Sequence, residues 1–276
     1  MTPLPQISPV VSPAWLAEHP DAVVADVRWY LDGRDGHEAY LSGHLPGAVF
    51  VDLPTRLAAP PSAEQGRHPL PGPDAFAASM AEVGIGDDSI VVAYDDAGGA
   101  YAGRLVWMLR LLGVDAALLD GGIDAWSGPL ETGQGAVPEP GRLTPRGWAA
   151  SDLASIDDAY AEPVVLDARA PARYRGDAEP VDPRAGHIPG ARNAFFGDNL
   201  GPDKAFLAPE ALRVRFAALG ITDAEGVVSS CGSGVTACHN LIAMEYAGLG
   251  RGRLFVGSWS QYAATDRPAA TGPEPR

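Results

Sequence analysis

The feature that most constrains the fold is an internal repeat. The hexapeptide GHLPGA at residues 43–48 recurs as GHIPGA at residues 186–191. Each copy follows a short apolar run that ends in Asp-X-Arg, namely AVVADVR at residues 22–28 and VVLDAR at residues 164–169. A second apolar run and a helix-compatible segment then follow in the same order in both halves. Two halves built on one plan indicate a duplicated domain.

The apolar runs are short, rich in β-branched residues and separated by helical patterns. Continuous apolar strands that alternate with helices are typical of parallel sheets covered on both faces. We therefore predict an α/β fold of two tandem domains, each a mainly parallel sheet with helices on both faces. A Gly- and Pro-rich stretch without periodicity separates them. The predicted division is 1–130 for the first domain, 131–147 for the linker and 148–276 for the second domain, which suits a chain of 276 residues.

Charge and cysteine content exclude several classes of function. A formal net charge of −15 argues against nucleic acid and against anionic membrane surfaces as partners, and it means that any anion site must be built locally. Cys231 and Cys238 are the only cysteines, so no disulfide framework is expected, and a reducing cytoplasm suits a free thiolate. The first residues have no basic region and no long apolar core, so no signal peptide is predicted. We expect a cytoplasmic protein.

The segment VVSSCGSGVTACH at residues 227–239 predicts a strand, a tight loop and a helix around Cys231. Gly232 and Gly234 allow the loop to curl with positive φ, so that several N–H groups can point inward. The following helix adds its own unpaired N–H groups and the positive end of its dipole. Such a cradle favours the thiolate, which is the nucleophilic form of cysteine. The alternative is an inert cysteine buried at a strand end; the two glycines favour the reactive interpretation.

The first half lacks this cysteine. Aligning residues 91–102 (VVAYDDAGGAYA) with residues 227–238 (VVSSCGSGVTAC) places Asp95 opposite Cys231. A carboxylate in the same cradle is no comparable sulfur nucleophile. We therefore predict that the first half is a catalytically silent copy that supports or covers the second. Ligands of parallel sheets bind at the carboxyl ends of the strands, which is where Cys231 falls.

These features together resemble the rhodanese superfamily, specifically its two-domain thiosulfate and 3-mercaptopyruvate sulfurtransferases. The resemblance rests on the doubled domain, both hexapeptides, DGGIDAW at residues 120–126, RHPLP at residues 67–71 and CGSGVTA at residues 231–237. It implies a ping-pong reaction in which the cysteine takes a sulfane sulfur from a small anionic donor and becomes a persulfide. The sulfur then passes to cyanide, a thiol or a protein acceptor such as a thioredoxin-like one. Neither a metal nor an organic cofactor is implied.

Inward N–H groups would stabilise both the thiolate and the persulfide anion. The predicted catalytic loop comprises Cys231, Gly232, Ser233, Gly234, Val235 and Thr236, in which Thr236 either bonds the loop or caps the helix. Cys238 lies one turn into the helix, and we expect it to belong to the core.

Arginines are the predicted donor-binding residues. The resemblance implies that an arginine in ARYRG, matching Arg173, holds the anionic group of the donor, with Arg175 at most an accessory. A guanidinium suits a carboxylate because its donors form a bidentate fork. The resemblance further implies a second arginine, for which Arg184 in AEPVDPRAG is the candidate, although this segment is two residues longer than in the members compared. The alternative for each is a solvated surface charge.

Ser233 is implied by the resemblance to join a proton relay with a histidine and an aspartate. His68 matches the histidine, whereas the aspartate position aligns with Pro54, two residues from Asp52. The alternative for His68 is an ordinary loop histidine. His44 and His187, which occur in both halves including the silent one, are expected to be structural, as are the ion pairs of the Asp-X-Arg segments.

The neutral residues Gly232 and Ser233 favour 3-mercaptopyruvate as the donor. Thiosulfate is a dianion, and the rhodaneses that use it place cationic side chains directly after the cysteine. The alternative is a thiosulfate:cyanide sulfurtransferase with the same mechanism. A cysteine phosphatase would need an arginine six residues after the cysteine, where Ala237 stands. A non-catalytic binding module would not require Cys231 in its loop.

Overall fold

The computed structural model describes residues 5–275 and separates into two compact units. The first unit holds the residues up to Ala59, Pro71–Trp148 and Pro202–Phe206; the second holds Pro60–Leu70, Ala149–Gly201 and the residues from Leu207 onward. Each unit thus includes one short segment from the opposite half of the chain. The sequence boundaries at 130 and 148 stay a prediction, and they did not anticipate these two segments.

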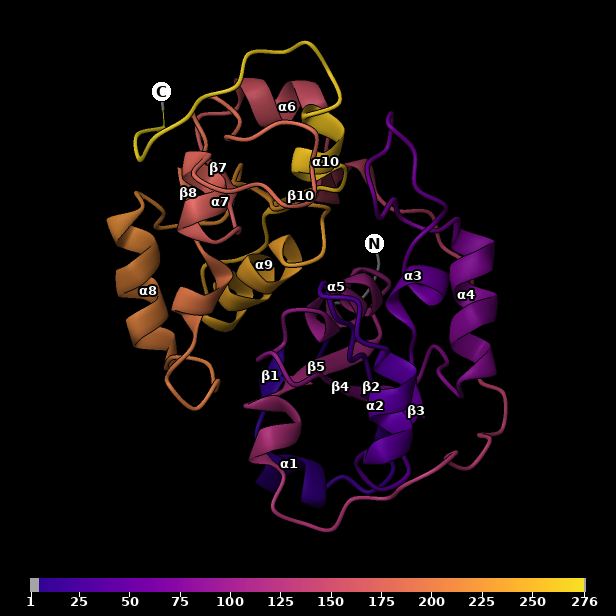
Figure 1. The fold of residues 1–276 in the computed structure, drawn as a ribbon. Helices are drawn as coiled ribbons and strands as arrows, with labels where there is room; N and C mark the ends of the chain where they lie inside the picture. Colours follow the sequence, from indigo (N-terminus) through magenta and orange to yellow (C-terminus); the bar gives the residue numbers. More distant parts are fainter. Residues whose placement is uncertain (1–4, 276) are drawn as a thin grey trace. The chain divides into compact units, whose positions relative to one another are not determined.

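The first unit is a five-stranded sheet in the order β1-β5-β4-β2-β3, in which every neighbouring pair is parallel. Its strands are β1 (Val10–Val11), β2 (Val23–Asp26), β3 (Val49–Phe50), β4 (Ile90–Tyr94) and β5 (Asp115–Leu119). Its helices are α1 (Pro13–Ala17), α2 (Gly36–Ser42), α3 (Leu53–Arg56), α4 (Pro73–Glu82) and α5 (Ala102–Leu111), with a 3₁₀ turn η1 (Gly122–Ala125). Helix α5 packs against β4 and β5, and α1 and α2 lie on the other side of the sheet (Figure 1).

The second unit repeats this topology, with a parallel sheet in the order β6-β10-β9-β7-β8. Its strands are β6 (Leu153–Ala154), β7 (Val165–Asp167), β8 (Arg192–Asn193), β9 (Val228–Ser230) and β10 (Arg253–Phe255). Its helices are α6 (Ile156–Ala161), α7 (Pro171–Arg175), α8 (Pro209–Ala218), α9 (Ala237–Tyr246) and α10 (Ser258–Tyr262), with 3₁₀ turns η2 (Ala150–Asp152) and η3 (Phe196–Asn199). Helices α6 and α10 lie on one side of this sheet, and α8 and α9 lie on the other (Figure 1). The predicted duplicated α/β fold is confirmed.

The duplication extends to the buried polar groups. In the first unit, Arg28 Nη2 lies 2.6 Å from Asp26 Oδ2 and donates a second hydrogen bond to the carbonyl of Gly43. In the second unit, Arg169 forms the same 2.6 Å pair with Asp167 and donates to the carbonyl of Gly186. Each arginine therefore ties the end of a central strand to the start of a hexapeptide. The prediction that these ion pairs are structural is confirmed.

The histidines of the hexapeptides also have matching roles. His44 Nδ1 lies 2.8 Å from the carbonyl oxygen of Tyr40, and His187 Nδ1 lies 2.8 Å from that of Tyr174. Each histidine ring also stacks on its tyrosine, with ring centroids 4.0 Å apart in the first unit and 3.8 Å apart in the second. Both histidines are completely buried, so they fix turns, as expected.

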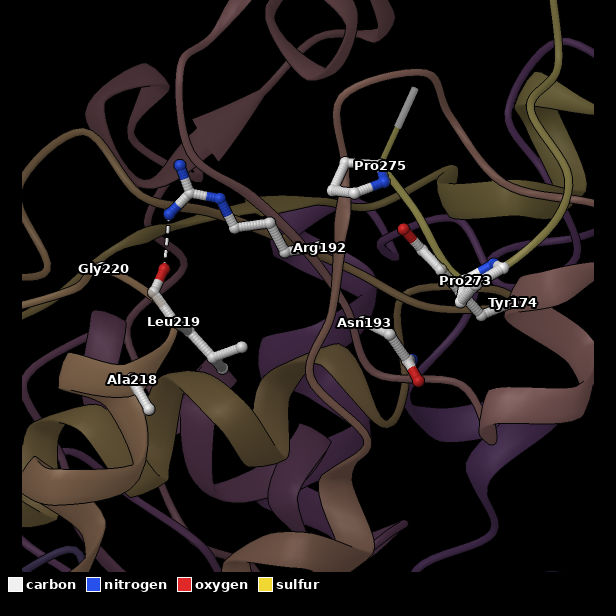
Figure 2. A pocket seen from close by; sticks show the side chains of 8 residues that line it. All are labelled: Tyr174, Arg192, Asn193, Ala218, Leu219, Gly220, Pro273 and Pro275. Carbon is white, nitrogen blue, oxygen red and sulfur yellow. Dashed lines mark hydrogen bonds between the residues drawn. The ribbon is translucent and has the colours of Figure 1, made fainter.

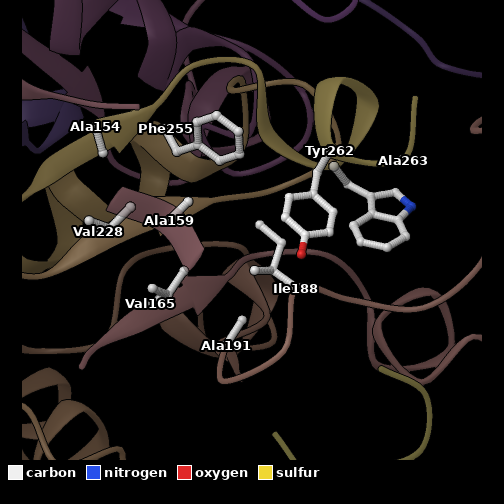
Figure 3. Packing of buried hydrophobic residues seen from close by; sticks show 10 residues of the cluster. Ala154, Ala159, Val165, Ile188, Ala191, Val228, Phe255, Tyr262 and Ala263 are labelled. Atoms are coloured by element: carbon white, nitrogen blue, oxygen red, sulfur yellow. The ribbon is translucent and has the colours of Figure 1, made fainter. Parts of the chain in front are cut away.

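An apolar cluster between the second sheet and its helices α6 and α10 forms one side of the core (Figure 3). Trp259 and Tyr262 of α10 stack on each other at 5.6 Å and pack over side chains of β7, β9 and β10. The cluster comprises Ala154, Ala159, Val165, Ile188, Ala191, Val228, Phe255, Trp259, Tyr262 and Ala263. It anchors α10, whose first turn contacts the Cys231 loop. Over the described residues, no helix is both long enough and apolar enough to cross a membrane.

A fragment of residues 145–276 is expected to be poorly active or unstable. It lacks Pro60–Leu70, a segment that belongs to the second unit and donates from Arg67 N to Ser260 Oγ at 3.1 Å. In the same segment, the carbonyl of Glu64 accepts a 2.6 Å hydrogen bond from Gln261. Urea unfolding and a sulfur-transfer assay of the fragment beside the full chain test this. Full activity and stability of the fragment would contradict it.

Candidate active site

Cys231 follows the last residue of β9, at the carboxyl edge of the second sheet. Its side chain is almost inaccessible, with the residue 2% exposed. The Sγ atom accepts a hydrogen bond of 3.1 Å from the backbone N–H of Gly234. Gly234 adopts φ +73°, which turns its N–H back toward the sulfur. Gly234 therefore curls the loop inward as predicted, whereas Gly232 does not adopt the positive φ that was also expected of it.

The segment Gly257–Ser260 holds the Cys231 loop from the neighbouring strand. The N–H of Cys231 donates to Ser258 Oγ at 3.0 Å, and its carbonyl accepts from Trp259 N at 3.0 Å. The carbonyl of Gly232 accepts from Ser260 N at 2.8 Å. With its N–H and C=O groups bound in this way, the backbone is fixed before any donor arrives.

The silent half shows what this loop geometry does to an anion. The carboxylate of Asp95 accepts four backbone hydrogen bonds, from the N–H groups of Ala97, Gly99, Tyr101 and Ala102, at 2.8–2.9 Å. Burial raises the pKa of Asp95, and these four donors act in the opposite direction. The loop–helix junction in this fold can therefore direct several N–H groups at one buried acidic side chain.

Two guanidinium groups overhang Gly232, the residue that follows Cys231. A Cβ atom placed on Gly232 would lie 3.0 Å from Arg67 Nη2 and 3.4 Å from Arg173 Nη1. Arg173 lies in the last turn of α7, and Gly176 is the C-cap of this helix. Arg67 comes from the Pro60–Leu70 segment and is a site residue that our sequence reasoning missed. The arginine predicted in ARYRG therefore does lie near the cysteine, beside a second arginine.

Buried carboxylates accompany both arginines. Asp182 Oδ1 pairs with Arg67 Nη1, and Asp182 Oδ2 lies 3.2 Å from Arg173 Nη2. Glu179 Oε1 accepts a 2.6 Å hydrogen bond from the same Arg173 nitrogen. Burial acts to raise the pKa of Glu179, but the hydrogen bond and charge of Arg173 bring it below its ordinary value. Burial raises the pKa of Asp182, and the two arginines offset part of that effect.

Ser233 and His68 are brought together as the predicted relay requires. Ser233 Oγ and His68 Nδ1 form a hydrogen bond of 2.8 Å. The third relay member stays a prediction. Asp52, the carboxylate nearest to Pro54 in the sequence, is the N-cap of α3, where its side chain accepts from the N–H and the hydroxyl of Thr55. The structure thus assigns Asp52 a local capping role.

The other predicted arginines and Thr236 differ from expectation. Arg184 donates to the carbonyls of Arg267 and Tyr262, so its guanidinium holds the C-terminal segment. Arg175 pairs with exposed Asp177 at 2.7 Å. Thr236 occupies the N-cap position of α9, but its side chain makes no capping hydrogen bond to the described chain. Its backbone is already helical, whereas a capping residue is normally extended, so the capping alternative for Thr236 was wrong.

A surface hollow of about 440 Å³ lies elsewhere in the second unit, between the end of α8 and the C-terminal segment (Figure 2). The guanidinium of Arg192 donates to the carbonyl of Leu219 and so completes the end of α8. The lining residues are Tyr174, Arg192, Asn193, Ala218, Leu219, Gly220, Pro273 and Pro275. None of these eight is a residue that the Cys231 site uses.

Comparisons with known proteins agree with this architecture. The rhodanese-like domain family matches residues 12–129 and 150–265. A Pseudomonas aeruginosa protein named a probable 3-mercaptopyruvate sulfurtransferase is 45% identical over 266 residues, which cover 92% of this chain and 93% of that protein. A Mycobacterium tuberculosis protein, provisionally named thiosulfate sulfurtransferase SseB, is 43% identical over 268 residues, which cover 90% of each. The solved 3-mercaptopyruvate sulfurtransferase from Leishmania major has a TM-score of 0.87 and 32% identity, covering 96% of this chain and 77% of that one.

The family follows from three findings, which are the duplicated parallel sheets, the two matched domains and these relatives. The chain belongs to the rhodanese superfamily, as one of its two-domain sulfurtransferases. As an enzyme of this class it takes sulfur from a donor and delivers it to an acceptor. The names of the two most similar relatives above differ in the donor, so the donor has to be argued from the site.

Proposed function

We propose that the protein transfers sulfur from 3-mercaptopyruvate, through a persulfide on Cys231, to cyanide or a thiol acceptor. The observation that carries this proposal is the Cys231 Sγ atom, held 3.1 Å from the Gly234 N–H at the carboxyl edge of a parallel sheet. The matching loop of the first unit supports it, because four N–H groups there surround the carboxylate of Asp95. The same geometry around Cys231 would stabilise a terminal persulfide anion.

The first half-reaction follows from this geometry. The Cys231 thiolate attacks the sulfur of mercaptopyruvate, a new S–S bond forms and the C–S bond breaks. The electron pair of the C–S bond leaves as the enolate of pyruvate, and the proton of the donor thiol ends on its carbon. Ser233 Oγ, bonded to His68 Nδ1 at 2.8 Å, is the group proposed to shuttle that proton.

The second half-reaction restores the free thiolate of Cys231. An acceptor thiolate attacks the outer sulfur of the persulfide and leaves as an acceptor persulfide, while Cys231 returns to the thiolate; cyanide in the same role leaves as thiocyanate. A thioredoxin-like protein is a proposed acceptor because its reactive thiol has a lowered pKa and is therefore largely thiolate near neutral pH.

The donor is inferred from the charges in the loop and beside it. Gly232 and Ser233 bring no cationic side chain to the loop itself. Beside the loop, Arg173 Nη1 and Arg67 Nη2 lie nearest to Gly232, so one nitrogen of each guanidinium can donate to the two oxygens of one carboxylate. Mercaptopyruvate carries a single carboxylate, and this arrangement suits it better than the compact dianion thiosulfate.

We expect kcat/KM for 3-mercaptopyruvate to exceed that for thiosulfate by at least about tenfold, a gap of about 1.4 kcal/mol. Arg173→Ala should lower kcat/KM for mercaptopyruvate chiefly through KM, because the carboxylate is bound alike in the ground and transition states. One lost charge-assisted contact costs about 1.5–3 kcal/mol, or roughly 10- to 150-fold. Steady-state kinetics with both donors test this. A wild-type preference for thiosulfate would reverse the donor assignment and leave the sulfurtransferase class intact.

A thiosulfate:cyanide sulfurtransferase is the second candidate, favoured by the presence of two guanidinium groups over Gly232. The same kinetics separate it from the first. The cysteine phosphatase loses support because Ala237 stands where it needs an arginine. The non-catalytic binding module loses support because Cys231 Sγ accepts a hydrogen bond from the Gly234 N–H in a loop that a binding module would not require.

A further inference from the structure

We propose that Asp182 is a specificity-determining residue, which selects singly charged over doubly charged sulfur donors by neutralising the two arginines that face Gly232. This inference rests on the proposed function and adds to it a residue that sets the charge class of the donor. It concerns the second unit alone, since Asp182, both arginines and Cys231 all belong to that unit.

The geometry is a carboxylate that bridges two guanidinium groups. One Asp182 oxygen pairs with Arg67 Nη1, and the other lies 3.2 Å from Arg173 Nη2. The opposite terminal nitrogens, Arg67 Nη2 and Arg173 Nη1, are those nearest to Gly232. Asp182 therefore sits behind a two-arginine clamp and sets its spacing. Only 2% of the Asp182 side chain is exposed, against 28% for Arg67 and 17% for Arg173, so the acid is behind and the bases are in front.

The Asp182 bridge affects the net charge of the arginine cluster. Arg67, Arg173 and Arg169 bring three positive charges to the cluster. Asp182, Glu179 and Asp167, the carboxylates paired with them, bring three negative charges. The arginine cluster is therefore neutral, although it presents two guanidinium groups to the donor.

A neutral clamp can form directional hydrogen bonds with an anion but gains little from a second anionic charge on it. Removing one carboxylate would leave the clamp with a charge of +1, and a dianion would gain about twice as much from that charge as a monoanion. The ratio of kcat/KM for the two donors therefore depends on the net charge of the clamp.

Asp182 lies in the segment AEPVDPRAG, two residues before Arg184. Backbone N–H groups of Val181 and Asp182 donate to Glu179 Oε1 at 3.1 Å each, and Glu179 accepts from Arg173. The same turn therefore brings a second acid, Asp182, to the clamp.

Asp182→Asn tests the proposal because it removes the charge and keeps an oxygen that can accept from one arginine. We expect kcat/KM for thiosulfate divided by kcat/KM for 3-mercaptopyruvate to rise about tenfold over wild type, as expected for one unit charge a few ångströms from a partly screened site. Inhibition by the dianion sulfate should strengthen about tenfold more than inhibition by the monoanion acetate, for the same reason. Asp177→Asn is the matched control, since Asp177 pairs with Arg175 at the surface and its loss should leave the ratio unchanged.

A purely structural role for Asp182 predicts a different result. If the carboxylate only positions the arginines, both donors lose activity in parallel and the ratio stays constant, which would overturn the proposal. The proposed function is tested separately in the wild-type protein, where persulfide formation with each donor is measured by intact mass before any variant is compared. Failure at that step would remove the Cys231 mechanism itself.

The pH dependence of the donor ratio in the wild-type protein provides a second test, which requires no variant. Protonation of Asp182 removes the same charge, so the thiosulfate-to-mercaptopyruvate ratio should rise as the pH falls. Arg67, Arg173, Arg169 and Glu179 are the charged groups that face Asp182. The arginines keep their charge, and the hydrogen bond and charge of Arg173 lower the pKa of Glu179 against the effect of its burial. If another group of the free enzyme titrates and changes kcat/KM for both donors by the same factor, the ratio of the two kcat/KM values does not change. A ratio that stays flat from pH 8 to about pH 4.5, near the ordinary carboxyl range, would contradict the proposal.

Discussion

Cys231→Ser is expected to lose sulfur transfer by at least about a thousandfold, because loss of a catalytic nucleophile removes the covalent intermediate itself. A serine hydroxyl in the same position also accepts the Gly234 N–H, so the loop should keep its fold. Intact mass of the donor-treated wild type should rise by one sulfur atom and return after cyanide. The Cys231→Ser protein should show no such change.

Cys238→Ser is the matched control for this experiment. Cys238 lies on α9, is completely buried and has its Sγ atom 3.4 Å from the carbonyl oxygen of Gly234. A serine there can make the same contact, so persulfide formation should be retained. Turnover by the Cys231→Ser protein, or loss of the mass shift in Cys238→Ser alone, would refute Cys231 as the sulfur carrier.

Gly234→Ala is expected to destabilise the protein by more than about 2 kcal/mol and to abolish most of its activity. A Cβ atom on Gly234 would lie 2.4 Å from the carbonyl oxygen of Val256, a backbone atom that no rotamer change can move. The residue also has φ +73°, and a side chain in the left-handed region costs about 1–2 kcal/mol by itself. Relief of the overlap would have to move the loop and, with it, the N–H that contacts Cys231 Sγ.

The control for Gly234 is a glycine that has the same backbone conformation and open space around it. Gly226 has φ +75°, lies in the exposed turn before β9 and would place its Cβ atom within 4 Å of no other atom. Gly226→Ala should therefore show the conformational cost alone, about 1–2 kcal/mol. Urea unfolding of both variants measures the difference. Equal stabilities, or a fully active Gly234→Ala protein, would show that the loop tolerates the side chain.

Local patterns in the sequence were enough to predict the parts of the fold that depend on near neighbours. Strand, glycine and helix signals around Cys231 lie within thirteen residues, and the structure confirms them as β9, a tight loop and α9. Ser12, which is followed by a proline, is a typical N-cap residue, and its side chain accepts from Trp15 N at the start of α1. Ser151 and Ser155 are both possible N-cap residues before the next helix. The helix begins at Ile156, because Ser155 and Asp158 form a reciprocal capping box that Ser151 cannot match.

The parts that escaped prediction depend on contacts between distant segments. Arg67 and Asp182 are 115 residues apart, and only the packing of Pro60–Leu70 into the second unit brings them together. Ser258, whose Oγ accepts from the N–H of Cys231, lies 27 residues further along the chain. Its role could have been anticipated, since β9 and β10 are adjacent and their carboxyl ends meet at one edge. Arg67 begins the RHPLP segment that supports the family resemblance, but no local pattern indicates that it packs beside Arg173.

The Asp95 cradle gives the two halves different relations to their anions. In the first unit the anion is the carboxylate of Asp95, which is part of the loop itself. The N–H groups of this loop therefore always have an anion bound. The Cys231 loop would instead alternate between an unloaded and a loaded form with every turnover. The rate of amide hydrogen exchange around α5 should therefore be the same with and without the persulfide on Cys231. The exchange rate at the start of α9 should fall when the persulfide forms. One half of the chain thus serves as an internal reference for the state through which the other half passes.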